Sequence, residues 1–327
     1  MLVLQLPEVK KAINMSDAIL VIEKAFIAFS RRETIMPLRH RVAISGDNVT
    51  LIMPAYLQSS QELGMKVVSV FPTNVEKGLP IILGFIILID SATGQLLALM
   101  DGTYLTALRT GAAGGVACRW LSRENSKTIA IIGTGVQART QLEAARAVRD
   151  IKEAYIYDLN QKQAEGFLEW AGKTLTEITV KITTTAEEGV EKADVVVTTT
   201  TSSKPVFDAR ALKVGTHINA IGTFKPQMQE IPEEAVLKAD KVVVDSIEAT
   251  MEETGDIIIP INKGNYTQER IYAEIGEIAA RKKPGRENDK ELTLFKTVGI
   301  AVQDVAVASL VYQRAKEKGT GQEINIW

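Results

Sequence analysis

The most constraining stretch of this sequence runs from Ile131 to Ala138 and reads Ile-Ile-Gly-Thr-Gly-Val-Gln-Ala. The apolar residues 128–132 predict a buried strand, and residues 137–148 predict a helix. Between them, the first glycine permits a tight turn, the second lets the main chain approach a pyrophosphate, and the alanine allows the helix to pack closely on the strand. The N–H groups at the start of the helix are free to bind phosphates. The pattern predicts a dinucleotide-binding loop made of Gly133, Thr134, Gly135, Val136, Gln137 and Ala138.

An acidic residue follows the second predicted strand, at residues 154–157. Asp158 lies where the dinucleotide motif expects an acid, roughly 20 residues beyond its first glycine, bound to the adenosine ribose hydroxyls. A carboxylate there repels the extra phosphate of NADP, so the sequence predicts NAD as the cofactor and disfavours NADP. In the alternative interpretation, Asp158 is an ordinary turn or helix-cap residue before Gln161.

The second half of the chain alternates between strand-like and helix-like stretches. Candidate strands lie at residues 128–132, 154–157, 180–183, 195–199, 217–221 and 241–244. This alternation predicts an α/β fold with a doubly wound parallel sheet of the Rossmann type, and a mostly helical chain after Asp245. Ligands of such sheets lie beyond the carboxyl ends of the strands, so Thr199, Thr200 and Gly222 are candidate cofactor neighbours. For the threonines, β-propensity is an equally good explanation.

The first hundred residues have a different pattern. A helix is predicted from about residue 15, capped by Ser16 or Asp17, followed by β-type runs at residues 39–44, 49–53, 65–71, 83–89 and 95–100. These runs predict an α+β domain with mainly antiparallel strands. A helix over residues 103–120, rich in small residues, is expected to leave this domain and pack closely on another element. We expect a first domain at residues 1–122 and a dinucleotide-binding domain at residues 123–304, with a helix at residues 305–327 returning to the first domain.

The composition excludes several classes of function. The net charge of −2 gives no sign of a nucleic-acid or membrane-surface patch, and no apolar run is long enough to span a bilayer. The N-terminus has no features of a signal peptide, which favours a cytoplasmic location. Cys118 is the only cysteine, and His40 and His217 are the only histidines. A cysteine-based or multi-histidine metal site and a Ser-His-Asp triad are therefore hard to build, and no metal is expected.

Several motifs resemble one known family nearly end to end. They are residues 104–115 (Tyr-Leu-Thr-Ala-Leu-Arg-Thr-Gly-Ala-Ala-Gly-Gly) followed by the glycine loop, and residues 53–55, 64–68, 217–222 and 295–299. These stretches resemble the ornithine cyclodeaminase/μ-crystallin family, and within it the archaeal-type alanine dehydrogenases and the Δ1-pyrroline-2-carboxylate (ketimine) reductases. The resemblance implies a homodimer whose first domain provides substrate groups and the dimer interface.

The resemblance also implies roles for particular residues. Lys66 matches the active-site lysine of the family, and Arg109 matches an arginine that reaches the substrate carboxylate or the cofactor phosphates. Arg39 matches a further carboxylate-binding arginine, and Arg41 could replace it because both lie on one strand face. Thr110 and Val298, in the matching motifs, are expected at the cofactor. Without the resemblance, Lys66 is more simply explained as an outward-facing residue on a half-buried strand.

One departure from the family pattern bears on the reaction. Ornithine cyclodeaminase carries an aspartate in the loop after the strand that ends at Gly222, and this loop has none; Phe224 takes what we judge to be its place. The acid-base group for cyclising ornithine is therefore missing. Asp304 is a spare candidate acid, although an ordinary polar position on a helix is the simpler interpretation.

These observations predict an NAD(H)-dependent oxidoreductase that transfers hydride at C2 of a small L-amino or cyclic imino acid. Arg39, Arg109 and Lys66 are expected to hold the carboxylate, and Lys66 or water to handle the proton at nitrogen. One alternative is ornithine cyclodeaminase, which forms proline and ammonia with NAD as a catalytic cofactor. Another is a μ-crystallin-like protein that binds NAD(P)H or a ligand with little turnover, although Lys66 and Arg109 are both present.

Overall fold

The computed structural model describes residues 1–326, which form two compact units. Unit 1 consists of residues 1–109 together with the chain from residue 300 onward, and unit 2 consists of residues 110–299. The long helix α3 (Thr103–Leu121) begins in unit 1 and ends in unit 2. The division falls inside this helix, whereas the sequence suggested a boundary after it, because the polar segment that follows a continuous helix is easier to recognise than a change of core within it.

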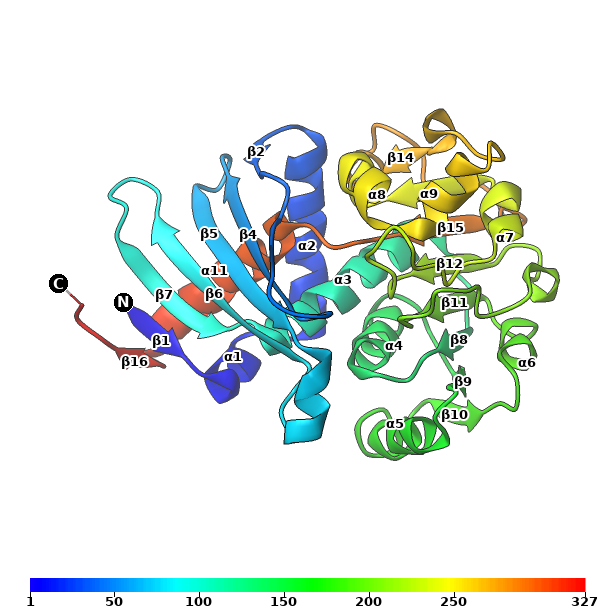
Figure 1. The fold of residues 1–327 in the computed structure, drawn as a ribbon, viewed down its shortest axis with the longest axis horizontal. Helices are drawn as coiled ribbons and strands as arrows, with labels where there is room; N and C mark the ends of the chain where they lie inside the picture. Colours follow the sequence, from blue (N-terminus) through cyan, green and yellow to red (C-terminus); the bar gives the residue numbers. More distant parts are fainter. Residues whose placement is uncertain (327) are drawn as a thin grey trace. The chain divides into compact units, whose positions relative to one another are not determined.

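Unit 1 is built on a mixed sheet with helices against it (Figure 1). The sheet has the order β16-β1-β7-β6-β5-β4-β2, with β3 also pairing with β4. Only β1 and β7 run parallel; the other pairs are antiparallel, which confirms the predicted fold class. The strands are β1 (Leu2–Leu4), β2 (Thr34–Ile35), β3 (His40–Ala43), β4 (Val49–Leu57), β5 (Glu62–Val70), β6 (Ile82–Asp90), β7 (Leu96–Asp101) and β16 (Gln322–Glu323).

Helices α2 (Met15–Ser30) and α11 (Ala301–Lys318) pack on each other, and α11 lies against β4, β5 and β6. The short helices α1 (Leu6–Ala12) and η1 (Pro72–Lys77) complete unit 1. Side chains alternate along β4 and β5, so every second residue faces this helical layer. The cap of α2 is Asn14, whose side chain accepts from the Asp17 backbone N–H at 2.9 Å, and not Ser16 or Asp17 as the sequence suggested.

The C-terminal segment corrects the prediction of a helix over residues 305–327. Helix α11 ends at Lys318, and Gly319 follows in the left-handed conformation with φ of 59°. A glycine there satisfies the last carbonyls and turns the chain out of the helix. The chain then forms β16, which pairs antiparallel with β1.

Unit 2 contains an eight-stranded sheet in which every pair is parallel, as predicted. Its order is β10-β9-β8-β11-β12-β15-β13-β14, so the direction of winding reverses between β8 and β11. Ligands of doubly wound sheets bind at such a reversal. The strands are β8 (Thr128–Ile132), β9 (Glu153–Tyr157), β10 (Thr179–Ile182), β11 (Val195–Thr198), β12 (His217–Ala220), β13 (Lys241–Val244), β14 (Ala273–Glu274) and β15 (Thr293–Lys296).

Apolar cores lie on both faces of this sheet. On β11, Val195 and Val197 face one core, which includes Phe167 of α5, and Val196 faces the other, which includes Val190 of α6. This alternation is what a sheet covered by helices on both sides requires. The helices are α4 (Val136–Val148), α5 (Gln161–Thr174), α6 (Ala186–Val190), η2 (Ala209–Ala211), α7 (Glu233–Lys238), α8 (Ile247–Glu253), α9 (Gly255–Asn262), η3 (Gln268–Arg270) and α10 (Ile275–Ala279).

Strand β15 was not expected, because the chain after Asp245 was predicted to be mostly helical. It lies between β12 and β13, and its four residues are all buried. The run Thr-Leu-Phe-Lys is short and half polar, so its burial depends on neighbours that the sequence does not reveal.

Close packing of α3 on α4 confirms the expectation raised by the small residues of α3. A Cβ added at Gly111 would lie 2.6 Å from the carbonyl oxygen of Thr140, and one at Gly114 would meet the side chain of Gln141. Gln141 in turn donates to the carbonyl of Thr110 at 2.9 Å. The glycines therefore allow two helix backbones of unit 2 to come together.

Candidate active site and cofactor site

Lys66 lies on the face of β5 that is turned toward α11 and is only 1% exposed. Its Nζ lies 2.8 Å from Oδ2 of Asp304. Burial lowers the pKa of Lys66 to about 7; Asp304 raises it, and the positive charges of Arg109 and Arg39 lower it. The interpretation as an outward-facing lysine is wrong, and a lysine with a pKa near neutrality can both give and accept a proton.

Arg109 shares the same carboxylate. Its Nε donates to Oδ1 of Asp304 at 3.0 Å, and its Nη1 donates to Oε1 of Gln303 at 2.7 Å. Asp304 is fully buried and Arg109 is 6% exposed. One carboxylate therefore lies between two buried cations, which leaves a surplus of positive charge that fits an anionic ligand.

Asp304 and Gln303 come from the first turns of α11. The simpler interpretation of Asp304 as an ordinary helix-polar residue is wrong, because its side chain bridges Lys66 and Arg109. An acidic residue inside the apolar run 300–308 was a signal of this, since buried charges need partners.

The side-chain amide of Gln303 uses its oxygen in hydrogen bonds but not its nitrogen. Its Oε1 accepts from Arg109 and from the backbone N–H of Ile300, at 2.7 Å and 3.2 Å. Its Nε2 is buried and has no hydrogen-bond partner among the described residues. A buried donor without a partner is costly, so a polar ligand would be favoured there.

Arg39 and Arg41 differ in their surroundings. Arg39 is half-buried just before β3 and contributes to the electrostatic field at Lys66. Arg41 is exposed on β3, where it pairs in register with Leu51. Of the two arginines, Arg39 is therefore better placed to join Lys66.

In unit 2 the glycine loop makes a tight turn between β8 and α4. Gly133 has φ of 87°, and a Cβ there would lie 2.9 Å from Cγ2 of Thr200. Gly135 is the N-cap of α4, and a Cβ there would meet nothing within 4 Å, so its surroundings are open. A cavity of about 620 Å³ borders this loop, lined by Gly133, Gly135, Asp158, Asn160, Thr199 and Thr200 among others. Its size and glycine cradle fit part of a dinucleotide.

Asp158 is tied to the same loop. Its Oδ2 accepts from the backbone N–H and hydroxyl of Thr134, at 2.7 Å and 2.9 Å. Its Oδ1 accepts from the backbone N–H of Asn160 at 2.8 Å. The alternative role as a turn residue is therefore also realised, and the half-buried carboxylate still lines the cavity.

The two threonines after β11 line the cavity but use their hydroxyl protons within the protein. Thr199 donates to the carbonyl of Gly133 at 2.6 Å, and Thr200 donates to Oε2 of Glu230 at 3.0 Å. Both hydroxyl groups therefore hold neighbouring loops together. This structural role differs from the two interpretations raised by the sequence, which were direct contact with the cofactor and β-propensity alone. No motif in the sequence pointed to this role of Glu230.

Other candidate cofactor residues are not among those that line this cavity. Thr134 and Ala138 are buried in unit 2, and Val136 is 69% exposed on the first turn of α4, next to Gln137. The backbone N–H of Val298 donates to Asp245 at 3.1 Å, and Thr110 is 8% exposed. Gly222 is held by Glu230, with 2.6 Å between its N and Oε1.

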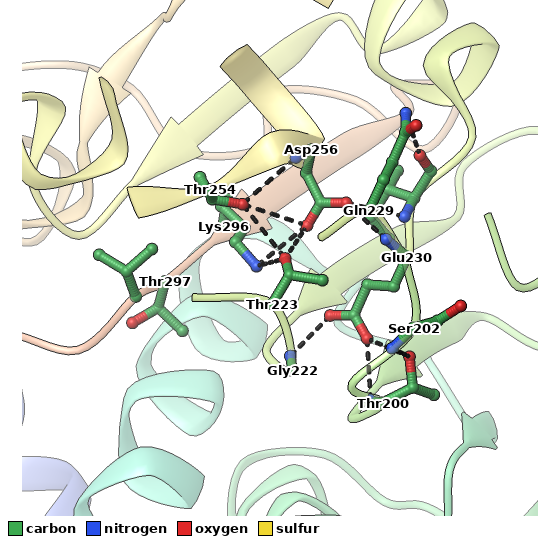
Figure 2. A network of polar contacts seen from close by, with 12 residues as sticks. Thr200, Ser202, Gly222, Thr223, Gln229, Glu230, Thr254, Asp256, Lys296 and Thr297 are labelled. Carbon is green, nitrogen blue, oxygen red and sulfur yellow. Dashed lines mark hydrogen bonds and ion pairs between the residues drawn. The ribbon is translucent and has the colours of Figure 1, made fainter. Parts of the chain in front are cut away.

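The loop after Gly222 lacks an aspartate, but a carboxylate reaches it from elsewhere. Asp256 of α9 contacts the hydroxyl of Thr223, and its Oδ2 lies 3.0 Å from Nζ of Lys296 (Figure 2). Phe224, next in the loop, is half-buried. The sequence missed this carboxylate because α9 is distant along the chain.

No group of three or more potential metal ligands lies together in the part of the chain that the structure describes. Among the same residues, no helix is long and apolar enough to cross a membrane.

Comparisons with known proteins find one family that is similar to this chain over nearly its whole length. Residues 1–319 match the model of the ornithine cyclodeaminase/mu-crystallin family. A Δ1-pyrroline-2-carboxylate reductase from Bacillus thuringiensis is 43% identical over 325 residues, covering 99% of this chain and 99% of the relative. An alanine dehydrogenase from Archaeoglobus fulgidus is 41% identical over 326 residues, covering 100% of this chain and 98% of the relative.

Two solved structures are similarly near. The Δ1-pyrroline-2-carboxylate reductase of Thermococcus litoralis, in complex with NADH and L-proline, has a TM-score of 0.96 and 44% identity, covering 99% of this chain and 100% of that one. An archaeal alanine dehydrogenase dimer with bound NAD has a TM-score of 0.94 and 40% identity, covering 100% of this chain and 99% of that one.

Proposed function

Because this chain belongs to the ornithine cyclodeaminase/mu-crystallin family, we propose that it is an NAD(H)-dependent oxidoreductase acting on the C–N bond of a small amino or cyclic imino acid. Δ1-Pyrroline-2-carboxylate, reduced to L-proline, is the first substrate to consider, and pyruvate with ammonia is the second. The relatives that carry these two activities differ little in identity to this chain, at 43% and 41%.

The buried Lys66 beside Arg109 is the observation that carries this proposal. Both substrates carry a carboxylate and, at C2, a C=N bond or its precursor. The cations Lys66, Arg109 and Arg39 exceed the single carboxylate of Asp304 by two charges if Lys66 is protonated. The free Nε2 donor of Gln303 adds a further group for the carboxylate of the substrate.

The proton at nitrogen is assigned to Lys66 or to a water molecule that it holds. In the reductive direction the carbon at C2 gains a hydride and the nitrogen gains a proton, so an imine becomes an amine. A lysine with a pKa of about 7 is present in both protonation states at neutral pH and can serve either direction. Arg109, fixed by Asp304 and Gln303, orients the carboxylate of the substrate.

A bound NADH would supply the hydride. The glycine loop would hold its pyrophosphate at the N-terminus of α4, and Asp158 would bind the adenosine ribose. The open surroundings of Gly135 and the adjoining cavity support this placement.

The activity is tested by following the absorbance of NADH with each substrate. We expect loss of NADH with Δ1-pyrroline-2-carboxylate, with pyruvate plus ammonia, or with both, and no loss after Lys66→Ala, which should still bind NADH. No turnover of either substrate by the native protein, despite tight NADH binding, would support a ligand-binding protein instead. Proline formed from ornithine with only catalytic NAD would point to ornithine cyclodeaminase.

The preference for NADH over NADPH is assigned to Asp158. Asp158→Ser removes the carboxylate that repels a 2′-phosphate, so the ratio of kcat/KM for NADH to that for NADPH should fall at least tenfold. Asp150→Ser, at a surface ion pair of the same unit, is the matched control and should leave the ratio unchanged. A ratio that is the same in Asp158→Ser and the native protein would contradict this role.

We further propose that unit 1 forms the interface of a homodimer. Apolar side chains of its sheet are unusually exposed: Val42 is 48%, Leu83 46% and Phe85 44% exposed. The similar archaeal alanine dehydrogenase is a dimer, which supports the proposal. Sedimentation should show a dimer for the native protein and a shift toward monomer for Phe85→Glu, but no shift for Val214→Glu, at a 70% exposed position of unit 2.

A cytoplasmic location is also a proposal. Its support is the use of NADH, which the cytoplasm supplies. Cell fractionation with an antibody against the chain would test it, and recovery with membranes or outside the cell would contradict it.

A further inference from the structure

A buried network of charged and hydroxyl side chains lies at the carboxyl edge of the unit 2 sheet (Figure 2). The proposed chemistry assigns no role to it. Its charged members are Glu230, Asp256 and Lys296, each no more than 1% exposed. Groups of this kind are expensive to bury and need a compensating arrangement of partners.

Glu230 connects the ends of two neighbouring strands. Its Oε2 accepts from the backbone N–H and the hydroxyl of Thr200, at 2.9 Å and 3.0 Å, after β11. Its Oε1 accepts from the backbone N–H of Gly222 at 2.6 Å, after β12. One carboxylate thus uses both oxygens to hold two loops together, and a shorter or neutral side chain could not hold both equally.

The main chain at Gly222 is packed too closely for any other residue. A Cβ there would lie 2.1 Å from the carbonyl oxygen of Thr200 and 2.8 Å from Oε2 of Glu230. Thr200 also packs against the glycine loop, since a Cβ added at Gly133 would lie 2.9 Å from Cγ2 of Thr200. The two strand ends and the glycine loop therefore form one continuous layer of contacts.

Asp256 holds the backbone of Glu230 in place. Its Oδ1 accepts from the backbone N–H groups of Glu230 and Ile231, at 2.8 Å and 2.9 Å. Its Oδ2 contacts the hydroxyl of Thr223 and lies 3.0 Å from Nζ of Lys296, which also donates to that hydroxyl at 2.6 Å. The pair Asp256–Lys296 therefore fixes both the backbone of Glu230 and the residue after Gly222.

The strand ends that Glu230 joins lie on the side of the sheet where one half of a dinucleotide would bind. Asp158 follows β9, on the adenosine side of the glycine loop, whereas β11 and β12 lie on the other side of β8 in the sheet. In a doubly wound sheet the second mononucleotide lies over that other side. For NADH it is the nicotinamide half.

We propose that Glu230 is a positioning residue for the nicotinamide half of the cofactor, acting through Thr200 and Gly222. This inference rests on the proposed function, because it requires that NADH bind at this edge. Its role is to fix the main chain that borders the nicotinamide, and Glu230 itself touches neither cofactor nor substrate. Glu230 hydrogen-bonds to Thr200 and Gly222 and not to the glycine loop or Asp158, so the adenosine half should depend on Glu230 less than the nicotinamide half.

The test compares two ligands on one variant. Glu230→Gln keeps the size of the side chain but turns one acceptor oxygen into a donor, so either Thr200 or Gly222 loses its partner. We expect NADH to bind about tenfold more weakly, or hydride transfer to slow by a similar factor, while the Kd of ADP stays within about twofold. Circular dichroism and a thermal melt establish that the variant is folded at the assay temperature.

Controls separate this role from a general loss of stability. Glu234→Gln, on the exposed side of α7, removes only a surface ion pair with Lys238 and should change neither Kd. If Glu230→Gln does not fold, Gly222→Ala forces the same two loops apart and keeps the buried carboxylate. Its own control is Gly172→Ala on α5, where a new Cβ meets nothing within 4 Å.

Each outcome decides the inference. Equal weakening of NADH and ADP, or a lower melting temperature with unchanged NADH binding and hydride transfer, would show that Glu230 only maintains the fold. Selective loss for NADH in Glu230→Gln or Gly222→Ala would support the positioning role. Failure of the native protein to bind NADH at all would overturn the proposed function itself.

Discussion

At the scale of single residues, the site of unit 1 is governed by one carboxylate and the cations around it. Lys66 would be an unfavourable buried charge by itself, and Asp304 raises its pKa while burial and two arginines lower it. The balance leaves the pKa of Lys66 near neutrality, where small changes in its surroundings have large effects on its protonation. Its neighbours therefore control the chemistry as much as the lysine does.

The pH dependence of turnover should follow Lys66. If protonated Lys66 supplies the proton to the nitrogen, kcat/KM for imine reduction should decline as the pH rises through about 7, and kcat/KM for amine oxidation should increase over the same range. Stopped-flow measurements in both directions from about pH 5 to 9 would check this.

The control for that profile is Lys66→Met, which keeps most of the volume and removes the titrating group. It should bind NADH normally and lose turnover in both directions. A reductive profile that stays flat through neutral pH in the native enzyme would rule out Lys66 as the proton donor.

Asp304→Asn should affect both stability and pH dependence. Two buried cations lose their shared carboxylate, so the free energy of unfolding should fall by about 3–5 kcal/mol. Because Asp304 raises the pKa of Lys66, its loss should move the midpoint of the reductive profile to lower pH. Urea unfolding and the pH profile measure the two effects.

Asp47→Asn is the matched control for Asp304→Asn, because Asp47 is exposed in the turn between β3 and β4. It should change neither the unfolding free energy nor the profile by a measurable amount. A midpoint that moves upward in Asp304→Asn would contradict the electrostatic role of Asp304.

At the scale of elements, glycines decide how closely helices and loops approach. Gly111 and Gly114 bring α3 against α4, and Gly222 brings the end of β12 against the end of β11. The helix α11 has a similar organising role in unit 1, since it lies against β4, β5 and β6 and carries Gln303 and Asp304 in its first turns.

Gly111→Ala should destabilise the protein even though alanine favours helix. The gain in helix propensity is about 1 kcal/mol, but the new Cβ would meet the Thr140 backbone at 2.6 Å, and overpacking of this kind costs about 1–3 kcal/mol. Gly166→Ala on α5, where nothing lies within 4 Å, should instead stabilise by up to about 1 kcal/mol. Urea unfolding of both variants should give opposite signs; a stabilising Gly111→Ala would show that α3 and α4 can separate freely.

At the scale of the whole molecule, the chain forms two compact units, with the buried cations Lys66 and Arg109 in one and the glycine loop in the other. The chain belongs to the ornithine cyclodeaminase/mu-crystallin family, whose model matches residues 1–319, and two relatives match it over nearly their whole length. The bounds of the units, residues 109/110 and 299/300, place Asp304 and Gln303 with Lys66 and not with the glycine loop.

Cofactor binding should stabilise the unit that holds the glycine loop. At a concentration of NADH one hundred times its Kd, the added stability is about 2.7 kcal/mol, which should raise Tm by several degrees in a calorimetric melt. If the two units unfold in separate transitions, NADH should raise the midpoint temperature of the transition that belongs to unit 2. NADPH at the same concentration should raise it less, and an equal shift with both cofactors would contradict the assigned preference.

Several parts of this protein could be predicted from the amino-acid sequence because they depend on neighbours along the chain. The glycine loop between strand and helix, the acid after the next strand and the alternation of the second half are local patterns, and each predicts its structure through backbone geometry or periodicity. The family resemblance added Lys66, Arg109 and Arg39; Lys66 and Arg109 both pair with Asp304, and the charge of Arg39 acts on Lys66.

Other parts depend on partners that are far apart in the sequence and meet only in the folded chain. Strand β15 is a strand because β12 and β13 enclose it, and α11 ends at Lys318 because Gly319 turns the chain toward β1. Asp304 pairs with a lysine more than two hundred residues earlier, and Glu230 joins two loops through a carboxylate supported by α9. A buried charge is stable only with such partners, and folding alone brings them within hydrogen-bond distance.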